Sequence, residues 1–423
     1  MRVVLAGSSS ITNLGDQAIL LCMMQDLRKV FGPDVRFSIL TYYPDIARER
    51  LGHLPGVERV LPLPWSGQLP LNWRLASAKL AWFAARRRVP VLHGLARNRE
   101  SIGALETADL VAFVGGRYLA TPYFYPVLER LVDATIAARR GVPRVAWAQS
   151  IGPFATIKEK VAASMLLRRL DLVCARDEAS FEFLRHFAVA GPRVERVADC
   201  VFNLEPAARE EVDRAMRAEG IARGARPLVA VTARTLAFTM ERHDAAATEH
   251  YLEQMARACD EVATRLADMV FLSSTYRAGT YTRHDPDVGR EIQKRMRRPE
   301  ALKIVDREYP APVVKGMYAR MDAVVSTRMH PVIFASAAGV PVVGLAYEYK
   351  TVELFKLLGL EEHCSRVTTI DAATVVAQVA RALERADEIR AHLARRIPEL
   401  QAMAFRSAEA TREIVEAGPR RAR

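Results

Sequence analysis

An arginine and a histidine two positions apart mark the segment with the clearest chemical potential. Arg328 and His330 follow the apolar run 322–325 and precede a helix-like segment, residues 331–338, which Gly339 ends. This pattern predicts a strand, a turn and a helix. Both side chains then stand at the carboxyl end of a strand and at a helix N-terminus. Ligands of open α/β sheets bind at strand carboxyl ends, and helix N-termini favour anions, so we expect an anion-binding site here.

Other polar groups are predicted at the ends of strands. Arg234 comes just after the predicted strand 228–232, and Lys350 follows the apolar run 340–346. In the first half of the chain, polar or glycine-bearing turns follow predicted strands at residues 13–17, 115–116 and 149–153. A helix cap or a plain tight turn would explain each of these turns alone. Together they favour a binding site with cations on one side and polar groups on the other.

The elements that must position these groups follow an α/β pattern. Short apolar runs alternate with segments of helical period, which predicts doubly wound parallel sheets. The pattern changes near residue 205, where a charged helix begins. We therefore predict an N-terminal Rossmann-like domain, 1–205, and a C-terminal one, 206–423, closed by two C-terminal helices.

Length and composition agree with a two-domain globular protein. The chain has 423 residues and a formal net charge of +12, and chains of this length usually split into two cores. The basic residues are scattered and no nucleic-acid-binding module accompanies them, so we do not expect nucleic acid as a partner. No run approaches the roughly 18 apolar residues of a membrane span.

The five cysteines lie far apart without a C-x-x-C pair. This spacing is typical of free thiols in a reducing cytoplasm, and neither a metal site nor a cofactor is expected.

Residues 73–88 are basic and aromatic. One interpretation is a helix that lies on the inner face of the membrane; the other, which we favour, is a surface helix buried on one side.

Several common catalytic motifs are absent from the sequence. It contains no G-x-G-x-x-G run, no Walker A motif, no G-x-S-x-G elbow and no H-E-x-x-H. Their absence argues against hydride transfer, nucleoside triphosphate hydrolysis, serine acyl transfer and zinc hydrolysis.

The ordered set of motifs resembles the polysaccharide pyruvyltransferase family, and the match covers most of the chain. The matching segments are Asn13-x-Gly15-Asp16-x-Ala18-Ile19-Leu20, Gly115-Gly116, Gln149-Ser150-Ile151-Gly152-Pro153, Arg176-Asp177-x-x-Ser180, Asp199, Ser326-x-Arg328-x-His330-x-x-Ile333-Phe334-Ala335, Gly339-x-Pro341 and Tyr347-Glu348-x-Lys350. The resemblance implies a GT-B-like fold, with two Rossmann-like domains facing a central cleft. It also implies transfer of pyruvate from phosphoenolpyruvate to two hydroxyls of a sugar or glycan precursor, forming a cyclic ketal.

The resemblance also implies roles for individual residues. Those implied to bind phosphoenolpyruvate are Arg234, Arg328, Met329 and Lys350. The loops after the first-half strands should converge at one edge of their sheet, so we expect Asn13, Gly15, Gly115, Gly116, Arg117 and Gln149 to bind the acceptor. Arginine matches phosphate and carboxylate in planar geometry. Histidine is a suitable acid near neutral pH, so His330 is the expected acid, and Asp16 is the candidate base.

The chain departs from the family pattern at two positions. Arg117 stands where the family usually has a third glycine, and Cys200 stands where it usually has proline. A guanidinium at residue 117 favours an anionic acceptor, such as a nucleotide-linked, lipid-diphosphate-linked or acidic sugar. Two other functions stay open from the residues: a GT-B glycosyltransferase that uses a nucleotide sugar, and a non-catalytic protein that binds a sugar or a partner.

Overall fold

The computed structural model describes residues 1–8, 11–64, 98–121, 124–187, 191–236, 245–277 and 284–418. The basic, aromatic segment 73–88 lies outside these residues. The chain forms two compact units. The first unit contains Met1–Ile11, Ile19–Asn203 and Gln401–Arg423, and the second contains Thr12–Ala18 and Leu204–Leu400.

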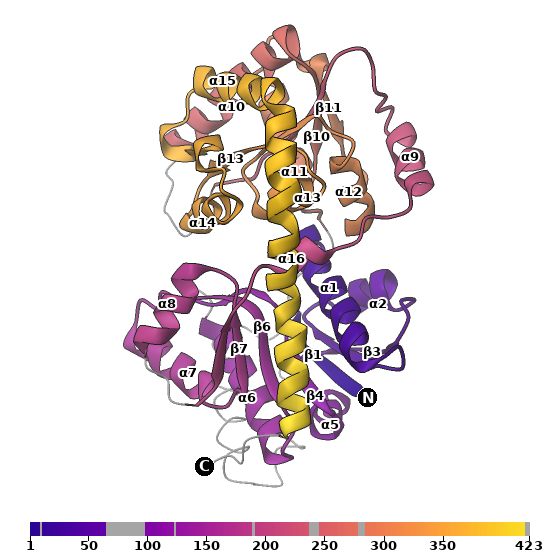
Figure 1. Cartoon of the computed structure of the whole chain (residues 1–423), viewed down its shortest axis with the longest axis vertical. Coiled ribbons are helices and arrows are strands. Elements are labelled where there is room, and N and C mark those ends of the chain that lie inside the picture. Colours follow the sequence, from indigo (N-terminus) through magenta and orange to yellow (C-terminus); the bar gives the residue numbers. More distant parts are fainter. Residues whose placement is uncertain are drawn as a thin grey trace. The chain divides into compact units, whose positions relative to one another are not determined.

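The first unit is built on an eight-stranded parallel sheet in the order β3-β2-β1-β4-β6-β7-β8, with β5 pairing to β6. The strands are β1 (Arg2–Ser8), β2 (Arg36–Thr41), β3 (Val57–Pro62), β4 (Leu110–Phe113), β5 (Gly116–Leu119), β6 (Arg144–Ile151), β7 (Leu172–Ala175) and β8 (Arg193–Arg196). The α-helices between them are α1 (Leu14–Phe31), α2 (Pro44–Leu51), α5 (Arg99–Thr107), α6 (Phe124–Arg139), α7 (Ile157–Leu167) and α8 (Glu178–Phe187). In Figure 1 these helices flank the sheet of the first unit.

The second unit is built on a six-stranded parallel sheet in the order β11-β10-β9-β12-β13-β14. Its strands are β9 (Leu228–Thr232), β10 (Asp268–Leu272), β11 (Leu302–Val305), β12 (Ala323–Ser326), β13 (Val342–Ala346) and β14 (Cys364–Arg366). Its α-helices are α9 (Arg209–Ala218), α10 (Ala245–Arg265), α11 (Asp285–Gln293), α12 (Ala311–Tyr318), α13 (Met329–Ala337), α14 (Tyr349–Leu358), α15 (Ala372–Glu384) and α16 (Ala386–Ala417).

Burial explains why these segments become strands. All residues of β4, β6, β7, β9, β12 and β13 are buried. Helices cover both faces of a parallel sheet, so its strands are rich in apolar residues; β6 is the exception, since it also buries Arg144, Gln149 and Ser150. The predicted α/β class with parallel sheets is therefore confirmed, and the predicted strand 228–232 matches β9 to the residue.

Two short segments belong to a different unit from the residues next to them in the sequence. Thr12–Ala18 belongs with the second unit, and Gln401–Arg423, which includes the end of α16, belongs with the first. The sequence predicts only one passage of the chain from the first domain to the second, near residue 205. The end of α16 is bound by the β8 arginine, because Arg193 pairs with Glu413 at 2.6 Å. Its 32 residues make a helix about 48 Å long.

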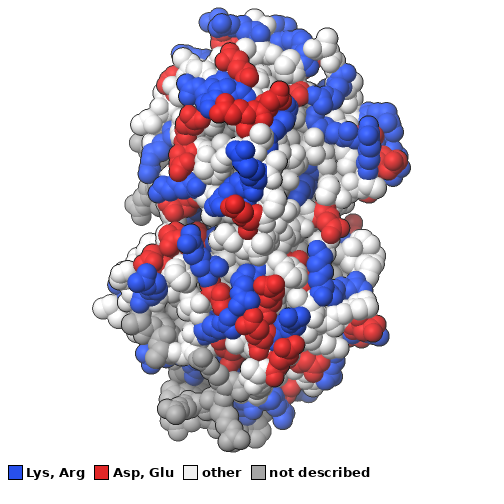
Figure 2. Space-filling model, in the orientation of Figure 1, with Lys and Arg blue, Asp and Glu red and all other residues white. Residues whose placement is uncertain are grey.

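Charge is mixed over the face of the molecule drawn in Figure 2. Lysine and arginine side chains alternate with aspartate and glutamate instead of forming one basic stripe. A continuous basic stripe is the usual footprint of a nucleic-acid-binding surface. Within the described part of the chain, no helix has the length and apolar character needed to cross a membrane.

Candidate functional site

Two arginines occupy equivalent positions after neighbouring strands of the second unit. In the register of β9 and β12, Thr232 pairs with Ser326, and Arg234 and Arg328 each follow two residues later. The Thr232 and Ser326 hydroxyl oxygens lie 2.7 Å apart and share a hydrogen bond. The parallel register therefore brings the two guanidinium-bearing segments to the same edge of one sheet, as the sequence predicts.

The Ser326 side chain holds the backbone from which the Arg328 side chain leaves. The Arg328 N–H donates to Ser326 Oγ at 2.9 Å, and Ser326 Oγ donates to the Arg328 carbonyl at 2.7 Å. Since the Ser326 hydroxyl has only one proton to donate, Thr232 is the donor in the bond between the two hydroxyls. Arg328 is the N-cap residue of α13, in an extended conformation with φ −106°. Its backbone is thus fixed at the start of the helix.

Arg234 and Lys350 both lie close to the ring of Tyr347. The Arg234 Nη1 donates to the Tyr347 hydroxyl at 2.6 Å, and the Arg234 guanidinium carbon lies 4.3 Å from the Tyr347 ring centroid. The Lys350 ammonium lies 5.9 Å from the same centroid. Cations are attracted to an aromatic face within about 6 Å. Tyr347 follows β13, the neighbour of β12, so three adjacent strands carry these groups.

Two of the three predicted donor-binding cations are paired with buried carboxylates. Arg328 Nη2 donates to Asp285 Oδ1, and Lys350 Nζ lies 2.7 Å from Glu348 Oε1. Only 3% of the Asp285 side chain and 7% of the Glu348 side chain are exposed. The site therefore holds fixed negative charge beside its positive charge. The sequence prediction missed Asp285, although an aspartate after a strand and before a proline is a signal for a helix start.

The Tyr251 hydroxyl lies beside Thr327, the residue before Arg328. Its side chain is fully buried on α10, and its hydroxyl is 3.5 Å from the Thr327 Oγ1. Burial raises the pKa of Tyr251 to about 12; the charge of Asp285 acts in the same direction and that of Arg234 opposes it. Tyr251 therefore stays protonated at neutral pH and is a hydrogen-bond donor at this edge of the sheet.

His330 lies against the turn that begins α1. Asn13 Oδ1 accepts a hydrogen bond from the Gly15 N–H at 2.9 Å, and the Leu14 N–H donates to the Ser274 carbonyl at 2.9 Å. A Cβ atom at Gly15 would lie only 2.0 Å from the His330 Nδ1. The structure thus brings the predicted acid together with a residue predicted to bind the acceptor.

The predicted site residues Asp16 and Met329 are sequence neighbours of Gly15 and His330. Asp16, the candidate base, lies in the first turn of α1. Gln17, which follows it, is buried, and its Oε1 accepts from the Ala311 N–H at 2.7 Å. Met329 is 8% exposed. The roles given to Asp16 and Met329 stay predictions.

The predicted acceptor residues of the first unit meet where β5 pairs with β6. Gly116 pairs with Gln149 in that register, and Gly116 has φ +135°, a region that favours glycine. A Cβ atom at Gly115 would lie 2.9 Å from the Trp147 carbonyl oxygen. Gln149 is fully buried, and its Nε2 donates to the Val114 carbonyl at 2.7 Å. Backbone conformation and close packing account for the two glycines, and the bond to Val114 accounts for the Gln149 Nε2. The acceptor role of all three residues stays a prediction.

Arg117 lies on β5 and is half-buried. The next residue, Tyr118, has the guanidinium of Arg130 at 4.9 Å from its ring centroid, and Arg130 Nη2 donates to the Gly7 carbonyl at 2.8 Å. The sequence prediction did not single out Arg130, which lies inside a helical segment of mixed polarity.

Several motif residues form a buried network in the first unit. Arg176 Nη1 lies 2.7 Å from Asp199 Oδ2, and Arg176 Nε donates to Ser150 Oγ at 2.9 Å. Ser150 Oγ donates in turn to Asp177 Oδ2 at 2.6 Å. Burial tends to lower the pKa of Arg176, but Asp199 and Asp177 outweigh it and raise that pKa. These motif residues stabilise the loops after β6 and β7.

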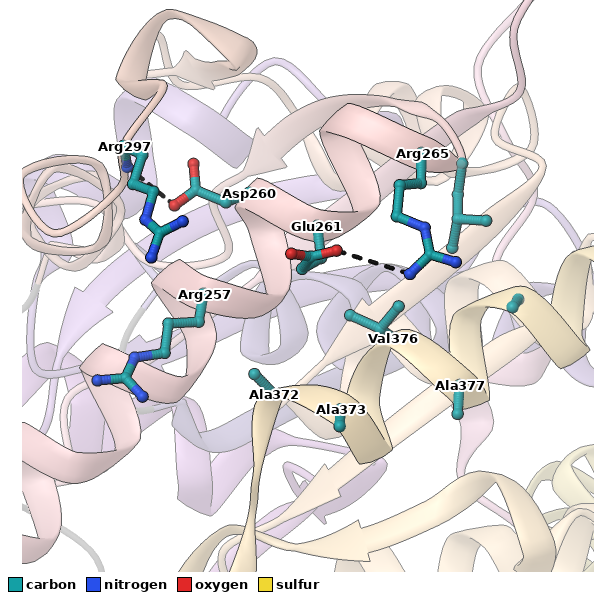
Figure 3. A pocket seen from close by; sticks show the side chains of 11 residues that line it. Arg257, Asp260, Glu261, Arg265, Arg297, Ala372, Ala373, Val376 and Ala377 are labelled. Atoms are coloured by element: carbon teal, nitrogen blue, oxygen red, sulfur yellow. Dashed lines mark hydrogen bonds and ion pairs between the residues drawn. The ribbon is translucent and has the colours of Figure 1, made fainter.

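A pocket of about 590 Å³ lies elsewhere in the second unit, between α10 and α15 (Figure 3). Its lining residues are Arg257, Asp260, Glu261, Arg265, Leu266, Arg297, Ala372, Ala373, Val376, Ala377 and Ala380. Arg265 pairs with Glu261 at 3.7 Å, and Asp260 accepts from the Arg297 N–H at 2.8 Å. None of the predicted site residues lines this pocket.

Clusters of metal-binding side chains are not found in the part of the chain that the structure describes. There, no group of three or more His, Cys, Asp or Glu residues is arranged to hold a metal ion.

Comparison with known proteins gives a family match and a fold match. Residues 13–349 match the family model described as polysaccharide pyruvyl transferase. The chain is also 22% identical to the amylovoran biosynthesis protein AmsJ of Erwinia amylovora, over 94% of this chain and 95% of that protein.

Solved structures with the same fold include two sugar-processing enzymes. Sucrose-phosphate synthase from Thermosynechococcus elongatus aligns with a TM-score of 0.59 at 13% identity, covering 99% of this chain and 100% of that one. The UDP-GlcNAc 2-epimerase from Neisseria meningitidis aligns with a TM-score of 0.58 at 11% identity, covering 98% and 99%. At these identities the similarity establishes the GT-B-like fold alone.

Proposed function

Because the chain belongs to the polysaccharide pyruvyl transferase family, we propose that it transfers pyruvate from phosphoenolpyruvate to two hydroxyls of a sugar. The product is a cyclic ketal on a cell-surface polysaccharide or its precursor, and the reaction takes place in the cytoplasm. The similarity to a protein of amylovoran biosynthesis supports a role in polysaccharide assembly.

One observation carries the donor assignment. Arg234 and Arg328 lie at the same register position after adjacent strands, and Lys350 shares the Tyr347 ring with Arg234. Phosphoenolpyruvate carries a phosphate and a carboxylate, and guanidinium groups bind both in bidentate geometry. Lys350 is a compact cation suited to the departing phosphate.

His330 is the proposed acid. Protonation of the terminal carbon of the enol leaves positive charge at the carbon that carries the phosphate, and a sugar hydroxyl attacks there. A second hydroxyl then displaces phosphate at the same carbon. One of the two hydroxyl protons ends on the new methyl group and the other on the released phosphate. Asp16 is the proposed base for the first hydroxyl.

Phosphate release from phosphoenolpyruvate tests this function. The protein would be incubated with phosphoenolpyruvate and a panel of free, nucleotide-linked and lipid-diphosphate-linked sugars. We expect phosphate release that depends on one class of acceptor. The competing glycosyltransferase function predicts instead that a nucleotide sugar is consumed while phosphoenolpyruvate stays intact. The shared fold does not decide between the two functions.

A further inference from the structure

We propose that Asp285 is a positioning residue of the donor site, holding the Arg328 guanidinium and the turn against which His330 lies. The inference rests on the proposed function, in which Arg328 binds phosphoenolpyruvate. It assigns to the reaction a carboxylate that does not itself touch the donor.

The two oxygens of Asp285 have different partners. Oδ1 accepts from Arg328 Nη2, and Oδ2 accepts from the Ser274 backbone N–H at 3.1 Å. The Asp285 N–H donates to the Thr275 carbonyl at 2.9 Å. Asp285 is thus bound on one side to the arginine after β12 and on the other to the loop after β10.

Because both side chains are largely buried, the Asp285 carboxylate and the Arg328 guanidinium each depend on the other for a partner. Asp285 is 2% exposed, and the Arg328 side chain is 12% exposed. A buried carboxylate is tolerated when an opposite charge and hydrogen bonds replace its hydration. A guanidinium has five N–H donors, so a carboxylate at one nitrogen does not exhaust its capacity to bind an anion. Asp285 therefore restricts the orientation of Arg328 before the donor arrives, which lowers the entropic cost of binding.

The loop that Asp285 binds also holds the first turn of α1. The Ser274 carbonyl accepts from the Leu14 N–H at 2.9 Å, and the Tyr276 N–H donates to the Thr12 carbonyl at 3.1 Å. Asn13 and Thr275 form an antiparallel bridge. Gly15, within this turn, lies against the His330 ring. One carboxylate thus supports both the donor-binding arginine and the surroundings of the acid.

A purely structural role for Asp285 makes a different prediction. An aspartate in the first turn of a helix is favourable in any protein, and Asp285 begins α11. If that were its whole role, replacing it would lower stability but leave the donor affinity of the folded protein unchanged. Asp287 in the same turn provides the matched control, because its carboxylate is about half exposed and pairs with Arg277 and Arg290.

The experiment is a double-mutant cycle on the full-length protein. The variants are Asp285→Asn, Arg328→Met and their combination, with Asp287→Asn as the control. Asp285→Asn keeps an acceptor for the Ser274 N–H but loses the charge opposite Arg328. Phosphoenolpyruvate affinity is measured by titration calorimetry, kcat and KM by phosphate release, and folding by thermal melts.

We expect Asp285→Asn to weaken phosphoenolpyruvate binding by about tenfold or more, since hydrogen bonds between charged groups contribute at that level. In the Arg328→Met background, the same change should have little further effect on affinity, because the two residues act as a unit. Asp287→Asn should bind phosphoenolpyruvate like the wild type. The inference is overturned if Asp285→Asn binds like the wild type, or if the two effects on affinity multiply independently.

Two further outcomes distinguish a failure of this inference from a failure of the proposed function and from a variant that does not fold. If the wild type itself does not bind phosphoenolpyruvate, the proposed function is wrong and the inference falls with it. If Asp285→Asn does not fold, the melts of Arg328→Met and of the double variant decide. Removing a buried carboxylate that has lost its arginine should raise the Tm of Arg328→Met, and a fall in Tm would overturn the inference.

Discussion

The backbone of Gly15 lies so close to His330 that a Cβ atom at residue 15 would come within 2.0 Å of the imidazole Nδ1. Gly15 is not among the glycines with positive φ, so space and not backbone conformation requires glycine here. The ring is a side chain, and it would move if residue 15 were larger. The position of the proposed acid therefore depends on the absence of a side chain at residue 15.

We predict that Gly15→Ala lowers kcat by about 10²-fold, the cost of moving a catalytic group by about an ångström. Phosphoenolpyruvate affinity should change little, because the donor cations are not displaced. Steady-state phosphate release and calorimetry measure the two effects. Gly103→Ala on α5 is the control, since a Cβ atom there meets nothing within 4 Å. Equal kcat for both variants would contradict the prediction.

His330→Ala should abolish most turnover while the protein stays folded. A general acid contributes roughly 10²- to 10⁴-fold to the rate. Steady-state rates and thermal melts are measured on the same preparations. Near-normal activity would refute the acid role, and so would a loss of stability with unchanged activity per folded molecule.

Tyr347→Phe should raise the KM for phosphoenolpyruvate with a smaller effect on kcat. The change removes the 2.6 Å hydrogen bond from Arg234 but keeps the ring beneath the guanidinium. Arg234 then has more freedom, and donor binding must restrict it. Tyr309→Phe is a matched control, because its hydroxyl donates to Glu219 at 2.7 Å in the same unit. An equal KM in the two variants would remove Tyr347 from the donor site.

Arg117→Gly tests whether the acceptor is anionic. Its kinetics on charged and neutral acceptors should show a loss of preference for the charged one, because the guanidinium that pairs with phosphate or carboxylate is gone. If the variant keeps that preference, Arg117 does not recognise charge in the acceptor.

The free energy of unfolding should decrease in mild acid because of His363. This residue is 1% exposed, and burial lowers its pKa from the usual 6.5. Its contribution is complete above pH 6.5. As the pH falls below 6.5 towards the lowered folded pKa, the unfolded chain takes up a proton that the folded chain does not, and the free energy of unfolding decreases. Urea unfolding at a series of pH values measures this slope.

His363→Leu should flatten that slope, because it removes the group that titrates. The Glu362 Oε1, 3.5 Å from the His363 Nε2, opposes the effect of burial on the pKa but does not cancel it. His186→Leu is the control, because 80% of the His186 side chain is exposed. An unchanged slope in His363→Leu would assign the acid sensitivity to other groups.

The sequence predicts the strand–turn–helix around Arg328 because its apolar runs are long enough to be recognised. The two arginines could be placed at one sheet edge because parallel strands share a direction. Short, charged strands were missed: β8 has the sequence Arg-Val-Glu-Arg, which carries no apolar run.

The pairing of Arg328 with Asp285 could not be predicted, because it joins residues 43 positions apart and depends on the order of β10, β9 and β12 in the sheet. The same limit applies to the first turn of α1. Its place in the second unit follows from hydrogen bonds to Ser274 and Tyr276, which no local pattern in the sequence indicates.

Product analysis tests the central claim most directly. The protein is incubated with phosphoenolpyruvate and the acceptor that stimulates phosphate release, and the sugar product is examined by mass spectrometry. The account predicts that the acceptor gains the mass of pyruvate less one water, with one phosphate released for each pyruvate transferred, and that Arg328→Met forms far less product. An acceptor that gains a sugar residue instead, or that stays unchanged while phosphoenolpyruvate is not consumed, would contradict it.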